Sequence, residues 1–179
     1  MKREKKIVLV AHCLLNTNAK VNGLATVSGA APIIKKLIDK GYGIIQLPCI
    51  EMSMFGTQRW GIVFEQCDFP EYRRRCRERL QPIVWQIEDY LNNGYIIKGV
   101  LGIDGSPTCA VNRTVSGQWG GELSGANSFR KNIDTAKEIN GKGVMMEELE
   151  KILIEKQIEI PFIALDEAHM EDTEILSKF

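Results

Sequence analysis

The sequence predicts an α/β fold, a Rossmann-like parallel sheet flanked by helices, as a single domain over residues 1–179. Short apolar runs alternate with amphipathic segments along the chain, an order typical of parallel sheets with right-handed crossovers. The length is about that of one domain, and 44% apolar residues suffice for one core.

Four apolar runs bounded by turn residues predict the strands, at residues 7–11, 43–47, 95–102 and 160–165. Three segments with an apolar residue at every third or fourth position predict the helices, at residues 30–40, 70–92 and 144–157. Gly41 and Gly94 follow the first two helical segments, as expected of residues that end a helix.

Two segments do not follow this alternation. Residues 112–143 are rich in Gly, Ser, Asn and Thr and are too long for an ordinary connector, so we expect a glycine-rich loop or lid. Residues 166–179 are expected to form an acidic, polar tail.

The charge balance argues against a generally basic nucleic-acid binder, because Lys+Arg and Asp+Glu both number 23. A local basic run lies on the second helical segment, and it would hold RNA phosphates if the substrate were a thiolated tRNA base. Acidic residues are interspersed with it, so a solvated helix face is the preferred interpretation and tRNA is not the favoured partner. The run consists of Arg73, Arg74, Arg75, Arg77 and Arg79.

The N-terminus lacks the features of a secretion signal, because its apolar run at 7–11 is interrupted by His12 and Cys13. No span approaches the roughly 20 apolar residues of a membrane helix. We therefore expect a cytoplasmic protein without a membrane partner, in which the five cysteines stay reduced. The sequence leaves its oligomeric state open.

Three of these cysteines share one position relative to the predicted strands. Cys13 follows the first strand, Cys49 the second and Cys109 the third. In parallel sheets, ligands bind in the crevice beyond the carboxyl ends of the strands, so we expect the three thiols in one pocket. Cys67 and Cys76 are expected to be small buried apolar residues instead.

Soft thiolate ligands select zinc, copper(I) or an iron–sulfur cluster. A structural zinc site takes four ligands, often in close pairs, whereas residues 13, 49 and 109 are widely spaced. Three ligands with one open position suit a catalytic centre. A [4Fe–4S] cluster with one free iron and a catalytic zinc with a bound water both meet this description, and the spacing alone leaves both open.

The segments AHCLLN, PCIEMSMFG and GIDGSPTCAV, in this order, resemble the three motifs of the bacterial thiouracil desulfidase family over residues 7–165. The resemblance implies that Cys13, Cys49 and Cys109 bind a [4Fe–4S] cluster whose fourth iron accepts sulfur from a thiolated pyrimidine. It also implies Glu51 and Ser106 as catalytic residues. The motifs differ from the usual family pattern at His12, Asn16, Ile50 and Thr108, and Met52–Gly56 lacks the Gly-Gly-Leu-Pro run that often follows the second motif.

We therefore expect an iron–sulfur-dependent desulfidase that removes sulfur, as sulfide, from a thiolated pyrimidine or a related small thio-compound. Glu51 would move the proton of a water or of the ring, Ser106 would hydrogen-bond the substrate or cluster-bound sulfur, and Asp104 is the rival acid. By strand alternation, His12 should point away from the pocket. The alternative is a non-enzymatic metal- or cluster-binding domain, such as a sensor, with zinc as the second choice of cofactor.

Overall fold

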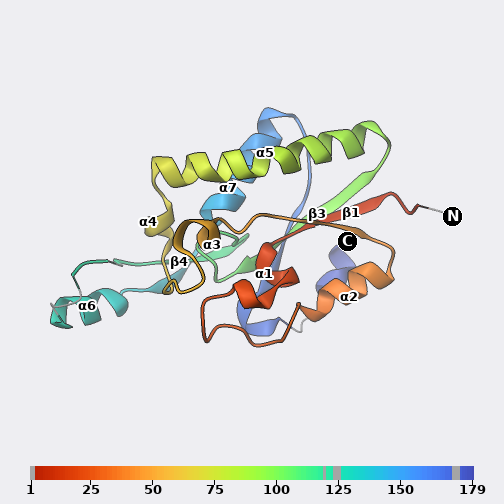
Figure 1. The fold of residues 1–179 in the computed structure, drawn as a ribbon. Coiled ribbons are helices and arrows are strands. Elements are labelled where there is room, and N and C mark those ends of the chain that lie inside the picture. Colours follow the sequence, from red (N-terminus) through yellow and green to blue (C-terminus); the bar gives the residue numbers. More distant parts are fainter. Residues whose placement is uncertain (1–2, 119, 123–125, 171–173) are drawn as a thin grey trace.

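The computed structural model confirms the predicted α/β class, with one parallel sheet and helices on both of its faces (Figure 1). It describes residues 3–118, 120–122, 126–170 and 174–179. The sheet has the order β2-β1-β3-β6, and each neighbouring pair is parallel. Its strands are β1 (Lys6–Val10), β2 (Gly43–Gln46), β3 (Ile96–Asp104) and β6 (Phe162–Asp166).

β1 is an inner strand, with β2 on one side and β3 on the other. Leu9 is in register with Ile45 of β2 and with Val100 of β3. Val8, Leu9 and Val10 are all fully buried. Because both faces of an inner parallel strand are covered, such a strand is a continuous apolar run rather than an alternating one, which explains the pattern seen at residues 7–11.

The three predicted helices form, each with its apolar side chains against the sheet or the neighbouring helix. They are α2 (Pro32–Asp39), α5 (Pro70–Asn92) and α7 (Val144–Glu155). α5 and α7 lie side by side over one face of the sheet, and α2 lies on the other face (Figure 1).

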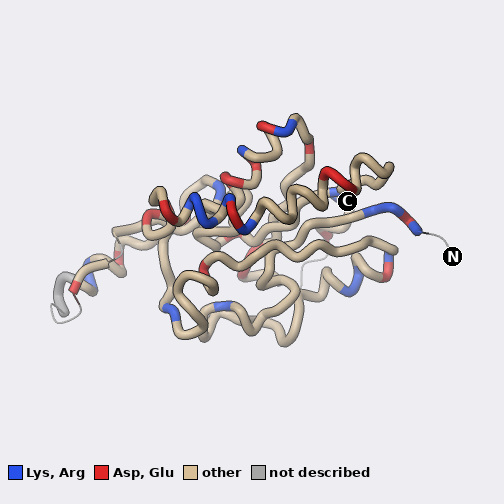
Figure 2. The backbone as a smooth tube through the Cα atoms, turned by 45° about the horizontal axis from the view of Figure 1, so that its top comes forward, with Lys and Arg blue, Asp and Glu red and all other residues tan. Residues whose placement is uncertain are grey.

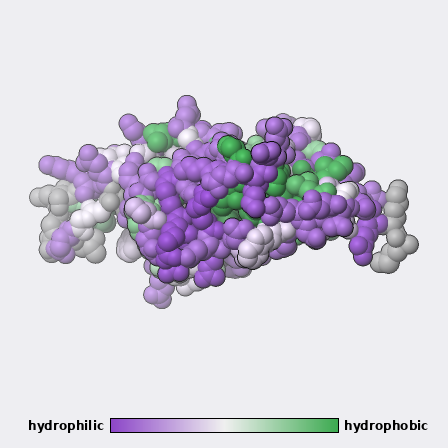
Figure 3. All heavy atoms as spheres, turned by 90° about the horizontal axis from the view of Figure 1, so that it is seen from above, coloured by the Kyte–Doolittle hydropathy of each residue, from purple (hydrophilic) through white to green (hydrophobic). Residues whose placement is uncertain are grey.

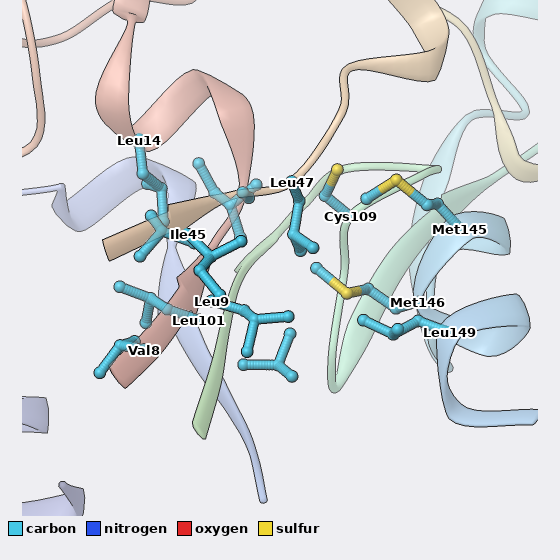
Figure 4. Packing of buried hydrophobic residues seen from close by; sticks show 14 of the residues in the cluster. Val8, Leu9, Leu14, Ile45, Leu47, Leu101, Cys109, Met145, Met146 and Leu149 are labelled. Carbon is cyan, nitrogen blue, oxygen red and sulfur yellow. The ribbon is translucent and has the colours of Figure 1, made fainter. Parts of the chain in front are cut away.

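The core lies between the sheet and these helices. Leu9 of β1, Leu101 of β3 and Met145 of α7 belong to one hydrophobic cluster and are fully buried (Figure 4). Burial of such a side chain contributes about 1.5–3 kcal/mol. This packing fixes the carboxyl ends of the strands, from which the candidate site is built.

Short helical elements follow the first two strands directly. α1 (His12–Leu15) and the 3-10 turn η1 (Thr17–Ala19) come after β1. α3 (Ile50–Phe55) and α4 (Phe64–Cys67) come after β2. The predicted site residues Cys13 and Glu51 therefore lie on α1 and α3, close to the ends of the strands.

The expectation of a glycine-rich loop over residues 112–143 is wrong for much of that segment. It contains β4 (Arg113–Ser116), α6 (Ala126–Ile133) and β5 (Lys137–Asn140), and β4 pairs antiparallel with β5. α6 lies away from the body of the fold (Figure 1). The two strands are short, and most of their residues are not buried, so they lack an apolar pattern. A lid function stays a prediction, and residues 119 and 123–125 lie outside the described residues.

Residues 166–179, expected as an acidic, polar tail, are folded where the structure describes them, and residues 171–173 lie outside the described residues. Asp166 ends β6, and two 3-10 turns follow, η2 (Glu167–His169) and η3 (Glu174–Lys178). Met170 and Ile175 are buried, and Tyr42 donates a hydrogen bond to the carbonyl oxygen of Phe179 (3.2 Å). The few apolar residues here are irregularly spaced, so their docking leaves no periodic pattern in the sequence.

Basic and acidic residues alternate along the first half of α5 (Figure 2). Four arginines of the basic run are ion-paired, for example Arg73 with Glu147 and Glu148 of α7. The other three are Arg74, Arg75 and Arg77. Arg73 and Arg77 therefore link α5 to α7, whereas Arg74 and Arg75 pair within α5. RNA binding by the run stays a prediction.

The surface over α5 and α7 is mostly hydrophilic, with hydrophobic residues at its centre (Figure 3). Within the described residues, none of the helices combines the length and the apolar character that crossing a membrane requires.

Candidate active site

A cavity of about 220 Å³ lies at the carboxyl ends of the strands. The connection after β1 leads to β2 on one side of β1, and the connection after β2 leads to β3 on the other side. The cavity therefore lies where the direction of the connections reverses. Ligands of open parallel sheets bind at such points. The structure brings all five sequence-predicted site residues into the wall of this cavity: Cys13, Cys49, Glu51, Ser106 and Cys109.

The three cysteines reach the cavity from three different elements. Cys13 is on α1, and Cys49 immediately precedes α3, where its Sγ accepts a hydrogen bond from the amide of Met52 (3.4 Å). Cys109 lies in the loop after β3, and it belongs to the same hydrophobic cluster as Leu47 and Met145 (Figure 4). Residues separated widely in the sequence are therefore gathered by the sheet.

Burial raises the pKa of all three thiols, that of Cys13 to about 12 and that of Cys109 well above its ordinary value. The positive charge of Lys20 opposes this rise at Cys13, and that of Arg59 opposes it at Cys49. At neutral pH the thiols are protonated and poor nucleophiles. A soft metal centre would displace their protons, because it binds the thiolate.

Ser106 holds the loop that carries Cys109. Its Oγ accepts hydrogen bonds from the amides of Thr108 (3.2 Å) and Cys109 (3.0 Å). The same hydroxyl donates to Oε1 of Glu51 (3.4 Å). The two predicted catalytic residues are thus in contact, and Ser106 connects Glu51 to a cysteine loop.

Glu51 is held by a second partner, Arg59, at 3.3 Å between Oε2 and Nε. The side chains are 12% and 5% exposed, so this is a largely buried ion pair rather than a solvated loop carboxylate. Arg59 also donates to the carbonyl oxygen of Ala19 (2.7 Å). Sequence reasoning missed Arg59, because it lies in a stretch without any periodic pattern.

Sequence reasoning also missed a second ion pair in the wall of the cavity. Nζ of Lys20 lies 2.7 Å from Oε1 of Glu167, and the lysine side chain is only 3% exposed. The pair joins the segment after α1 to η2. Neither residue carries a sequence signal, because one lies in a polar turn and the other in an acidic stretch.

His12 lines the cavity, so the expectation that it points away is wrong. β1 ends at Val10, and His12 is the first residue of α1, where strand alternation no longer applies. Its Nδ1 lies 2.8 Å from Nε2 of Gln46, and burial lowers the pKa of the imidazole. The ring is therefore neutral near pH 7.

Asp104 has a structural role and is not in the wall of the cavity. It is buried, and its Oδ1 accepts hydrogen bonds from the amides of Val111 (3.0 Å) and Asn112 (2.9 Å). These bonds close the turn that follows β3. The contacts thus favour Glu51 over Asp104 as the acid or base.

Two glycines let the backbone approach the Cys109 loop closely. A Cβ on Gly102 would lie 2.5 Å from the carbonyl oxygen of Cys109, and one on Gly143 would lie 2.4 Å from the carbonyl carbon of Thr108. Neither distance is tolerable for non-bonded atoms. Gly102 and Gly143 therefore permit a packing of the Cys109 loop that any side chain at these positions would prevent.

Cys67 and Cys76 are fully buried, as expected, and neither lines the cavity. Sγ of Cys67 lies 3.8 Å from Oγ1 of Thr108, which is also 3.0 Å from the hydroxyl of Tyr72. All five cysteines are free thiols.

The donor set of the cavity fits an iron–sulfur cluster in its chemistry. Three thiols from separate elements line one cavity, and its two buried cations, Lys20 and Arg59, are each paired with a carboxylate. Among the described residues, no group of three or more His, Cys, Asp or Glu side chains is arranged to hold a metal ion. A cubane is wider than one ion, so its ligands surround a volume rather than meet at a point.

Comparison with known proteins finds one relative of substantial similarity. The chain is 39% identical over 108 residues to "Uncharacterized protein MJ0003" of Methanocaldococcus jannaschii, and the match covers 60% of this chain and 69% of the relative. No family model matches the chain. No solved structure matches it either.

Proposed function

We propose a function from the residues of the site alone. The chain belongs to the same family as MJ0003, but the name of that archaeal protein assigns no activity. The proposed function is that of an iron–sulfur-dependent desulfidase, which replaces the sulfur of a small thiolated heterocycle, such as a thiolated pyrimidine, by oxygen. Water supplies the oxygen and two protons, and the sulfur leaves as hydrogen sulfide.

One observation carries the proposal: three thiols from three strand ends line the same cavity as Glu51 and Ser106. Cys13, Cys49 and Cys109 would hold the cluster. When bound, a [4Fe–4S] cluster with three cysteine ligands supplies an iron that polarises a carbon–sulfur bond as a Lewis acid. The proposal places the protein in the cytoplasm, where thiols stay reduced.

Glu51 provides the acid–base chemistry. Its carboxylate accepts the proton of the attacking water, and the ion pair with Arg59 together with the hydrogen bond from Ser106 fixes its orientation. Ser106 orients the carboxylate and holds the loop of Cys109 at the same time. A positioned carboxylate contributes about 10²–10⁴-fold to the rate of such a reaction.

The test measures sulfide released from 4-thiouracil by protein purified without oxygen. The wild type is expected to contain iron and acid-labile sulfide and to release sulfide. Glu51→Gln should keep the iron but release sulfide at least about 100-fold more slowly. The matched control is Glu65→Gln, because Glu65 also accepts a hydrogen bond from a serine, Ser116, but lies outside the cavity wall.

Two outcomes would overturn the proposal. Protein that carries the cluster but releases no sulfide from a panel of thiolated pyrimidines, purines and nucleosides would be a non-enzymatic cluster-binding domain. Colourless protein that contains zinc, or no metal, after preparation without oxygen would remove the iron–sulfur assignment itself.

A further inference from the structure

His12, one of the residues that line the cavity, has a ring nitrogen, Nε2, without a hydrogen-bond partner in the described part of the chain. It is buried, although the residue as a whole is only partly buried. A buried polar group without a partner costs about 1–3 kcal/mol. Buried groups are paired in the great majority of cases, so an exception in the wall of a cavity points to a ligand that supplies the partner.

The other ring nitrogen determines what Nε2 offers. Nδ1 of His12 lies 2.8 Å from Nε2 of Gln46, the last residue of β2. The nitrogen of a glutamine amide carries only hydrogen-bond donors, so Nδ1 must be the acceptor. A neutral imidazole then carries its proton on Nε2. Gln46 thus fixes the tautomer in which His12 presents an N–H donor.

We propose that His12 is a substrate-positioning residue, whose Nε2–H donates a hydrogen bond to a ring carbonyl oxygen of the thiolated heterocycle. The identity of the ligand rests on the proposed function. His12 lines the same cavity as Cys13, Cys49 and Cys109, so a heterocycle bound in that cavity lies beside the imidazole. The preferred substrates are therefore heterocycles that carry a carbonyl oxygen in addition to the thiocarbonyl sulfur.

The experiment compares two probes, 4-thiouracil and pyrimidine-4-thione, which differ in that the second lacks the ring carbonyl. Affinities are measured by calorimetry without oxygen, on cluster-containing protein with Glu51→Gln, so that no probe is consumed. With His12 present, 4-thiouracil should bind about tenfold more tightly. His12→Leu should abolish this preference, and His12→Gln, which can place an amide N–H near the position of Nε2, should restore part of it.

The control is the second histidine of the chain. His169 is 68% exposed and lies outside the cavity wall, so His169→Leu should leave the preference unchanged. Iron content and the paramagnetic resonance spectrum of the reduced cluster, both measured without probe, complete the comparison of the variants. We expect His12→Leu to leave both of them unchanged.

Three results would overturn the inference. The first is an equal preference for 4-thiouracil with and without His12, and the second is no binding of either probe to cluster-containing protein. The third is a changed iron content or spectrum in His12→Leu without probe, which would mean that the Nε2–H group of His12 donates its hydrogen bond to the cluster and not to the substrate. If the preference depends on His12 but protein with Glu51 intact releases no sulfide, the inference stands and the proposed function fails.

Discussion

The cavity at the carboxyl ends of the strands and the layer formed by α5 and α7 contain the same kinds of side chain in different settings. Both regions hold cysteines whose pKa is raised by burial, to about 12 at Cys13 in the first and at Cys76 in the second. Only the first group lines a cavity. Burial of a cysteine therefore does not mark a site, whereas convergence of several cysteines on one cavity does.

The arginines of the two regions also differ in their setting, because one is buried and the other is exposed. Arg59 of the cavity is 5% exposed and is shared between one carboxylate and two carbonyl oxygens, those of Ala19 and Gly56. Arg74 of α5 is 51% exposed and pairs with Glu71 and Glu78 on its own helix. A buried ion pair depends on both partners, whereas exposed pairs are screened by solvent.

The largest expected effect separates the two groups of cysteines. Cys49→Ser should remove nearly all iron and acid-labile sulfide from protein prepared without oxygen, because a cluster that loses one of three protein ligands is not retained. Cys76→Ser should keep the metal content of the wild type. Elemental analysis and sulfide determination measure both. Iron retained in the first variant, or lost equally in the second, would break the comparison.

A smaller effect separates the two groups of charges. Arg59→Met should lower the free energy of unfolding by about 3 kcal/mol, because it leaves the carboxylate of Glu51 largely buried without its cation. Arg74→Met should produce no measurable change. Urea unfolding of the metal-free protein measures the difference. Similar stabilities of the two variants would show that the cavity pair is solvated.

The smallest effect concerns pH and the core thiols. Because the pKa of Cys76 is raised from 9.0 to about 12 in the folded state, the thiol stabilises the protein fully below pH 9, and that contribution is lost as pH rises toward 12. Cys76→Ala should reduce the fall in unfolding free energy between about pH 9 and about pH 10 by about 1 kcal/mol. Urea unfolding at these two pH values checks this. An identical fall in both proteins would mean that Cys76 is solvated.

Much of the site could be predicted because its residues follow strands that the sequence makes evident. The runs at 7–11, 43–47 and 95–102 are apolar throughout, and parallel strands bring their carboxyl ends to one edge of the sheet. The placement of Cys13 and Cys49 follows from this rule alone. The helices were equally evident, because their apolar residues recur with a constant period.

The sequence by itself determined the four strands of the parallel sheet, the three long helices and the edge of the sheet at which the thiols line one cavity, because hydrophobic periodicity is a local property of the chain. Only the tertiary structure decided the charges of the cavity and the docking of the C-terminal segment. Lys20 and Glu167 are 147 residues apart in sequence, and their pairing depends on how β1 and β6 lie in the sheet. The absence of a hydrogen-bond partner at Nε2 of His12 among the described residues likewise depends on the tertiary structure, because it follows from where β1 ends and from which residues surround the ring.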